Sequence, residues 1–126
     1  MEKTISIDGR NVTFKATALT PRFYRHKFGR DMVRDLNRLR GAYTKAAALP
    51  EDADDETRLD AQLDAVDLEI FENAAYIMAR QADETVPADP DVWLDGFATF
   101  SIYKILPHIL ELWALNQHTT ATPKKK

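Results

Sequence analysis

The chain contains no cysteine, few glycines and no long apolar run. Without cysteine there can be no disulfide framework, no thiolate metal site and no cysteine nucleophile. The low glycine count, 4 in 126 residues, favours helices over an all-β sandwich. No apolar stretch approaches the roughly 20 residues needed to cross a bilayer, and the alternating first residues lack the apolar core of a signal peptide. We therefore expect a soluble intracellular chain that forms one domain.

Charge is unevenly distributed along the chain, although the net charge is only −3. Residues 1–47 carry 11 Lys and Arg against 4 Asp and Glu, whereas residues 48–99 carry 2 against 15. Residues 100–126 are again basic, with 4 against 1. Such a distribution predicts attraction between segments of one chain, or head-to-tail self-association of copies. Folding-back of oppositely charged helices is the commoner of these outcomes.

An N-terminal β-hairpin is predicted over residues 3–16. Residues 4–7 and 12–15 each alternate polar and apolar side chains, and Asp8-Gly9 separates the two runs. Glycine tolerates the positive φ that a tight hairpin turn requires. A lone hairpin is only marginally stable, so one of its faces must rest on the helices. The side chains expected on that face are Ile5, Ile7, Val12 and Phe14.

About five helices are predicted from residue 20 onward, so the expected fold is mainly α with a small hairpin packed on a helical domain. Thr20-Pro21 is typical of an N-cap followed by the first helical residue, because proline has no amide to leave unpaired there. Asp31 is the next expected cap. Asp89-Pro90 repeats the pattern of a cap followed by proline.

The longest helix is expected from Glu56 onward and should be central to the core. Its apolar residues recur every three or four positions, at Leu59, Leu63, Val66, Ile70, Ala74 and Ile77. Further apolar residues widen this side of the helix, namely Leu68, Phe71 and Met78.

The last apolar helix is interrupted by proline and followed by a polar end. Pro107 lacks an amide, so it must kink this helix or begin a new one after Leu106. The apolar pattern ends near Asn116. We therefore expect a single domain over residues 1–116 and a mobile tail over residues 117–126.

No arrangement of residues indicates catalysis, so we expect neither enzyme activity nor a cofactor. The sequence has no Gly-rich phosphate loop and no clustered His or Cys set. His108 and Glu111 are three residues apart and could share one face of a metal site, but two ligands do not make a site and a solvated helix surface is the favoured interpretation. Ser101 is more economically a helix cap than a nucleophile.

A basic helix face supplies the first candidates for binding a partner. Arg30, Arg34 and Arg38 recur four residues apart, and Asp31 and Asp35 can each pair with the arginine three residues on. Clustered cations suit nucleic acid. The acidic block that follows favours these arginines as partners of the acidic helix instead, so we expect no nucleic-acid binding.

Aromatic residues supply the second candidates. Plain core is the default interpretation, but a fraction that stayed exposed would anchor a partner, because Trp and Tyr give large contact area at low entropic cost. The set consists of Trp93, Phe97, Phe100, Tyr103 and Trp113.

The order of several short motifs resembles that of tail assembly chaperones from long-tailed (siphovirus-type) phages or prophages. These motifs span most of the chain around a variable acidic middle. The family has no catalytic motif, so no residue inherits an established role. The matching pieces are the hairpin start, Thr20-Pro21-Arg22 with Phe23 and Tyr24, Phe28-Gly29-Arg30-Asp31, residues 71–82, residues 92–97, Leu112-Trp113 and Asn116.

The resemblance implies a non-structural protein of the host cytoplasm that binds the long, aggregation-prone tape measure protein, with no membrane partner. In that family a run of A-rich lysine codons is often where ribosomes slip, and the lysines at 124–126 permit such a site. This chain would then be the short form, and a longer, frameshifted form would recruit tail tube subunits. Two other classes stay open, a small helical nucleic-acid-binding regulator and a virion structural connector.

Overall fold

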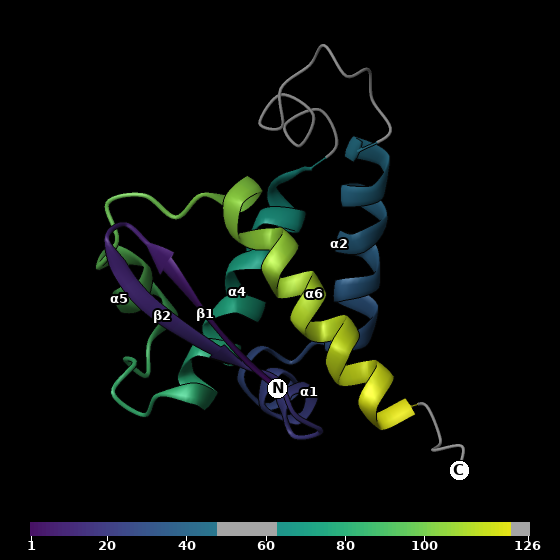
Figure 1. Cartoon of the computed structure of the whole chain (residues 1–126), viewed down its shortest axis with the longest axis horizontal. Coiled ribbons are helices and arrows are strands. Elements are labelled where there is room, and N and C mark those ends of the chain that lie inside the picture. Colours follow the sequence, from purple (N-terminus) through teal and green to yellow (C-terminus); the bar gives the residue numbers. More distant parts are fainter. Residues whose placement is uncertain (48–62, 122–126) are drawn as a thin grey trace.

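The computed structural model describes residues 1–47 and 63–121. A β-hairpin of two strands is followed by helices, so the predicted mainly helical fold with an N-terminal hairpin is confirmed (Figure 1). Helix α4 contacts the hairpin and the four other described helices, α1, α2, α5 and α6, and is therefore the centre of the fold. The elements are β1 (Glu2–Ile7), β2 (Arg10–Lys15), α1 (Thr20–Phe28), α2 (Met32–Ala47), α4 (Ala65–Ala82), α5 (Pro90–Asp95) and α6 (Ile102–Ala121).

The hairpin forms as its sequence predicts. Asp8 and Gly9 have φ angles of 54° and 79°, the left-handed values that a two-residue turn requires. The antiparallel register pairs Ile5 with Val12 and places them on one face with Ile7 and Phe14. Ile7 and Phe14 are buried, Ile5 and Val12 are half-buried, and this face packs on α4.

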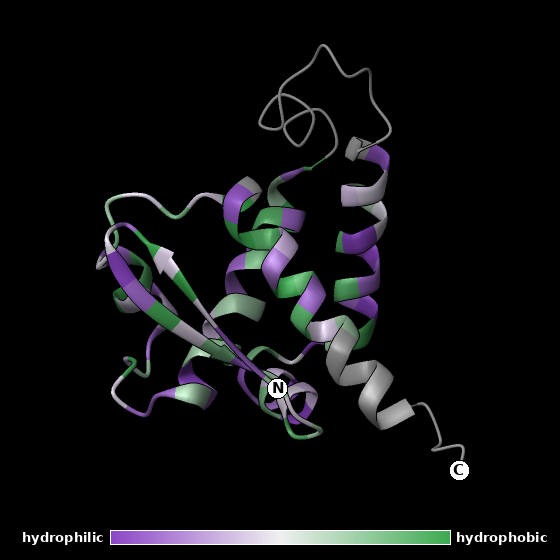
Figure 2. Ribbon diagram, viewed as in Figure 1, coloured by the Kyte–Doolittle hydropathy of each residue, from purple (hydrophilic) through white to green (hydrophobic). Residues whose placement is uncertain are grey.

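Helix α4 carries much of the core, but its first turn differs from the prediction. Ile70, Phe71 and residues 74–79 are buried, and Figure 2 shows apolar residues concentrated on α4 and on the part of α6 that crosses it. Val66 and Leu68 are exposed instead, at 42% and 41%. They were expected in the core, and that expectation is wrong. Leu59 lies outside the described residues.

A buried carboxylate takes the place of the expected apolar contact at the start of α4. Asp64 and Asp67 form a capping box, in which each side chain accepts from the backbone N–H of the other, at 2.9 and 3.1 Å. Asp67 is only 4% exposed. Because Asp67 faces inward, its neighbours Val66 and Leu68 are turned toward solvent.

The two short connections around α1 are fixed by capping contacts. The helix begins at Thr20, with Leu19 as its N-cap, so the prediction of Thr20 as the cap is wrong. The Thr20 hydroxyl is instead buried against α4, as described below. Gly29 ends α1 with a φ of 69°, and its N–H donates to Arg25 O. Asp31 caps α2 as predicted, because its Oδ1 accepts from Val33 N at 3.0 Å.

Helix α6 is one element that passes through Pro107 and ends at Ala121. It therefore extends beyond the expected end near Asn116 and includes residues 117–121 of the expected tail, whereas residues 122–126 lie outside the described part. Ser101 directly precedes the helix, but its buried hydroxyl has no hydrogen-bond partner within the described residues. Across the two described ranges, no helix combines the length and apolar character that spanning a bilayer demands.

Candidate partner-binding site

Arg30 contacts two buried polar residues where α1 meets α2, Asp35 directly and Tyr24 through Asp35. Its Nε and Nη2 atoms donate to the two carboxylate oxygens of Asp35 at 2.7 and 2.8 Å, and Tyr24 Oη donates to Asp35 Oδ2 at 2.8 Å. Burial opposes the charge of Asp35, but the bonds from Arg30 and Tyr24 outweigh it, and the pKa of Asp35 is lowered. Burial and the bond to Asp35 raise the pKa of Tyr24. Arg30 is thus engaged within the fold.

Arg38 connects α2 to the start of α4. Its Nε atom donates to Asp67 Oδ1 at 2.8 Å, and its Nη2 atom donates to Asp64 Oδ2 at 3.0 Å. The expected pairing of the arginine face with acidic residues of the next helix is confirmed at this position. The predicted pairing of Asp35 with Arg38 is wrong, because the buried Asp35 binds Arg30 instead.

Unlike Arg30 and Arg38, Arg34 has no ion pair among the described residues. The predicted ion pair with Asp31 is absent from the described residues, because Asp31 Oδ1 accepts from the backbone N–H groups of Val33 and Arg34. The three arginines therefore do not form one binding surface.

The aromatic candidates that the structure describes are core residues. Trp93, Phe97 and Trp113 are 6%, 8% and 2% exposed. Trp93 packs edge-to-face on Phe97 at 5.2 Å, and the Arg10 guanidinium lies 4.2 Å from the centre of the Phe97 ring. The core interpretation therefore holds for these three, and the interpretation as exposed anchors does not. The side chain of Tyr103 lies outside the described residues.

An open groove lies between α1, the C-terminal half of α4 and the loop that follows α4; we call it the α1–α4 groove. Its volume is about 750 Å³, which is within the range typical of binding pockets. Leu19 and Phe23 line one wall and are each 41% exposed, while the buried Tyr76 and Ile77 form the floor. An apolar surface of this kind is available to a partner.

Side-chain hydrogen bonds fix the spacing between the two helices at this groove. Thr20 Oγ1 donates to Gln81 Oε1 at 2.6 Å, and Gln81 Nε2 donates to Thr17 Oγ1 at 2.6 Å. Thr20 is fully buried. The Gln81 side-chain amide on α4 is thus held by the hydroxyl groups of Thr17 and Thr20 at the start of α1. The spacing between the two walls of the groove is therefore fixed without a partner.

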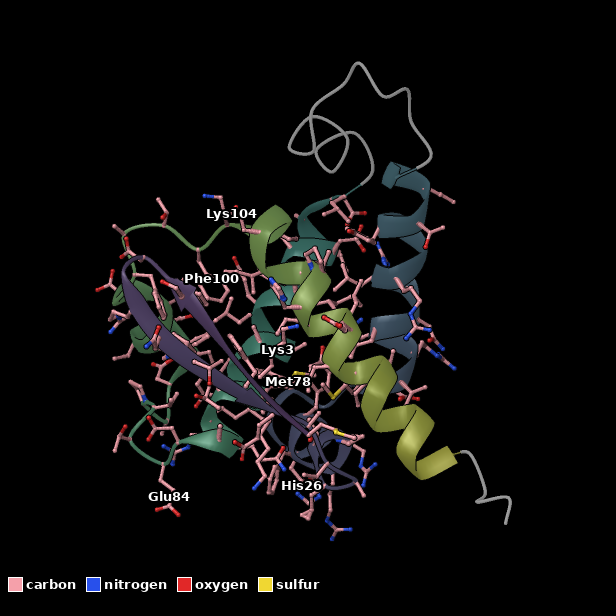
Figure 3. All side chains as sticks on the ribbon, in the orientation of Figure 1. Lys3, His26, Met78, Glu84, Phe100 and Lys104 are labelled. Carbon is pink, nitrogen blue, oxygen red and sulfur yellow. The ribbon has the colours of Figure 1, made fainter. Side chains whose placement is uncertain are left out.

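Basic side chains border the groove, and backbone carbonyl groups hold two of them. Lys27 Nζ donates to Ala88 O at 2.5 Å, and Arg80 Nη1 donates to the carbonyl oxygens of Glu84 and Val86. In Figure 3, His26 lies on α1 and Glu84 extends away from the body beyond the end of α4. Carbonyl oxygens orient these cations without cancelling their charge.

An acidic surface is formed by α4 and α5. Burial and the nearby charges of Glu69 and Asp91 raise the pKa of Glu72. Two exposed apolar side chains, Leu68 and Val92, belong to the same two helices. Helices α4 and α5 thus carry both acidic residues and exposed apolar residues, in contrast to the basic border of the groove.

Of the two residues considered for metal binding, Glu111 has another partner. Glu111 binds Lys3 at 2.7 Å, and this hydrogen bond lowers the pKa of Glu111. His108 Nδ1 is buried without a hydrogen-bond partner in the described part of the chain. Over residues 1–47 and 63–121, no three His, Cys, Asp or Glu side chains are grouped so that they could hold a metal ion.

Sequence reasoning did not identify the α1–α4 groove. A signal was present, because Leu19 and Phe23 are four residues apart and basic residues flank them. The pattern does not say which apolar pair stays uncovered, since that depends on where the distant residues of α4 lie. Comparisons with models of protein families, with curated proteins and with solved structures found no match to this chain.

Proposed function

We propose that this chain is a tail assembly chaperone of a long-tailed phage or prophage, and that it binds and solubilises the tape measure protein in the host cytoplasm. The observation that carries the proposal is the α1–α4 groove, with Leu19 and Phe23 exposed beside an apolar floor. The motif order that resembles this chaperone family supports it independently.

The physical reasoning starts from the partner. A long helical protein exposes apolar faces until it is built into a tail, and exposed apolar faces aggregate. A helix laid in an apolar groove hides that face from water, which is a common mode of helix recognition. A preset groove adds affinity because little order is lost on binding.

Co-expression tests this proposal. The chain and a tape measure protein encoded beside it are produced together, and the soluble fraction of the tape measure protein is measured with and without the chain. We expect a clear rise in solubility with the chain present. Equal precipitation in the two cultures would remove the proposal.

The resemblance also implies an extended form that brings tail tube subunits to the tape measure protein. Synonymous recoding of the lysines at 124–126 should eliminate a longer, minor product while leaving the protein sequence of the short form unchanged. Detection of one species only, at the same level before and after recoding, would reject the frameshift.

A second candidate function is nucleic-acid binding. It is favoured by the exposed cations Arg22, Arg25 and Arg34, which have no carboxylate partner among the described residues. Tight DNA binding near physiological salt, with a steep salt dependence, would favour this function over the chaperone. Presence of the chain in finished virions would favour a structural connector instead.

A further inference from the structure

The α1–α4 groove differs from the rest of the basic surface in how its cations are paired. The ion pairs of the described residues use Lys3, Arg30 and Arg38, all of them outside the groove. Around the groove, Lys15, Lys27 and Arg80 have no carboxylate partner within the described residues. An apolar floor is therefore bordered by three cations whose charge is not neutralised there.

We infer that the α1–α4 groove binds an acidic amphipathic helix of a partner protein. This inference rests on the proposed function and adds the chemistry of the bound segment. The apolar side chains of that helix contact Leu19, Phe23 and Ile77, while its carboxylates lie over Lys15, Lys27 and Arg80. Charge complementarity carries the argument, because a basic border attracts acidic segments and disfavours basic ones.

The position of the acidic residues next to the groove refines this picture. Glu84 is the only carboxylate among the described lining residues, and it extends toward solvent (Figure 3). Beyond Ala88 the chain becomes acidic at Asp89 and Asp91. A bound helix therefore places its acidic residues toward α1 and the end of α4, and avoids acidic residues at the α5 end.

Binding of designed peptides to the full chain tests the inference. Two fluorescent peptides share one helical apolar stripe and differ only in carrying Glu or Lys on the flanking positions. We expect the Glu peptide to bind at least about tenfold more tightly than the Lys peptide at low salt. The difference should shrink in high salt, since these charges are solvent-exposed.

Variants locate the site. Phe23→Ser should weaken binding of the Glu peptide at least about tenfold, as expected for the loss of an aromatic anchor. Lys27→Ala should weaken the Glu peptide and leave the Lys peptide unchanged or better bound. Val92→Ser is the matched control, because Val92 is also exposed, at 57%, but lies on α5 outside the groove. Circular dichroism confirms that each variant is folded.

Several outcomes would overturn the inference. Equal binding of the two peptides rejects the charge selection, and an equal effect of Phe23→Ser and Val92→Ser rejects the groove as the site. Sedimentation gives a third outcome: a dimer of the free chain that Phe23→Ser dissolves would identify the groove as a contact between copies.

The same variants separate this inference from the proposed function. If Phe23→Ser keeps the tape measure protein soluble as well as the unchanged chain does, the groove is not the site and the chaperone function stands. If the unchanged chain fails to solubilise that protein but selects the Glu peptide through Phe23, the groove inference stands and the proposed function fails.

Discussion

The network around Asp35 offers a sharp test of how the basic half of the chain is held together. Asp35 is 3% exposed and accepts three hydrogen bonds, from Tyr24 Oη and from two nitrogen atoms of Arg30. The substitution Asp35→Asn keeps the shape of this side chain and removes its charge. Each of the three donors then loses a charged acceptor.

The magnitude follows from the exposure of the donors. A hydrogen bond to a charged group contributes about 1.5–3 kcal/mol, and the buried bond from Tyr24 counts nearly in full. The Arg30 side chain is 50% exposed, so solvent screens that ion pair, and its contribution is about 0–1 kcal/mol. We expect Asp35→Asn to lower the free energy of unfolding by about 1.5–4 kcal/mol, or the thermal midpoint by about 5–20 °C.

Urea unfolding followed by tryptophan fluorescence measures this loss, because Trp93 and Trp113 are both buried in the core. Tyr24→Phe removes one donor only and should cost about 1.5–3 kcal/mol. Asp95→Asn is the control at an exposed position, where a change within about 0.5 kcal/mol is expected. If Asp35→Asn and Asp95→Asn give the same unfolding free energy, the network does not stabilise the fold.

The pH dependence gives an independent check with a definite sign. The pKa of Asp35 is lowered in the folded chain, so its contribution is present above the unfolded pKa of about 3.9 and is lost as pH falls through the folded pKa. The stability gap between the unchanged chain and Asp35→Asn should therefore be constant near neutral pH and shrink in acid. A gap that persists below both pKa values would show that the charge of Asp35 is not its source.

Three further predictions concern the helices. Ile70→Ala, in the buried part of α4, should cost about 2–5 kcal/mol in urea unfolding, whereas Val66→Ser, one turn earlier and exposed, should change stability by less than about 0.5 kcal/mol; similar losses would mean that the first turn of α4 is also core. Arg38→Met should lower the thermal midpoint more than Arg34→Met, because only Arg38 binds Asp67; equal midpoints would contradict a role for that contact. Gly41→Ala should raise stability by about 0.5–1 kcal/mol, since Gly41 lies within α2 with open space around it. Gly29→Ala should lower stability because of the positive φ at Gly29. Calorimetry measures both changes and distinguishes their signs.

Local signals explain the parts of the fold that could be predicted. Asp8-Gly9 specifies its own turn, and Asp31 caps α2 through N–H groups two and three residues on. These contacts need only neighbouring residues, so one stretch of sequence contains both partners.

The errors arose where partners are distant in sequence. Thr20 was expected to cap its own helix, but its hydroxyl is bound by Gln81, 61 residues later. Val66 continues the apolar spacing of α4, yet Asp67 is the buried side chain there because Arg38, 29 residues earlier, supplies a counter-charge. The spacing of apolar residues describes one helix alone. It cannot show that another helix supplies a counter-charge to a residue of this one.

The same reasoning explains why the binding residues could not be found from the charge pattern. An excess of basic residues in the first part of the chain does not say which cations remain unpaired. In the folded chain Arg30 and Arg38 form ion pairs with aspartates. Lys27 and Arg80 instead donate hydrogen bonds to backbone carbonyl groups beside an apolar floor. The kind of partner therefore follows from the cations that folding leaves without a carboxylate. At the α1–α4 groove, these cations and the apolar floor favour an acidic amphipathic segment.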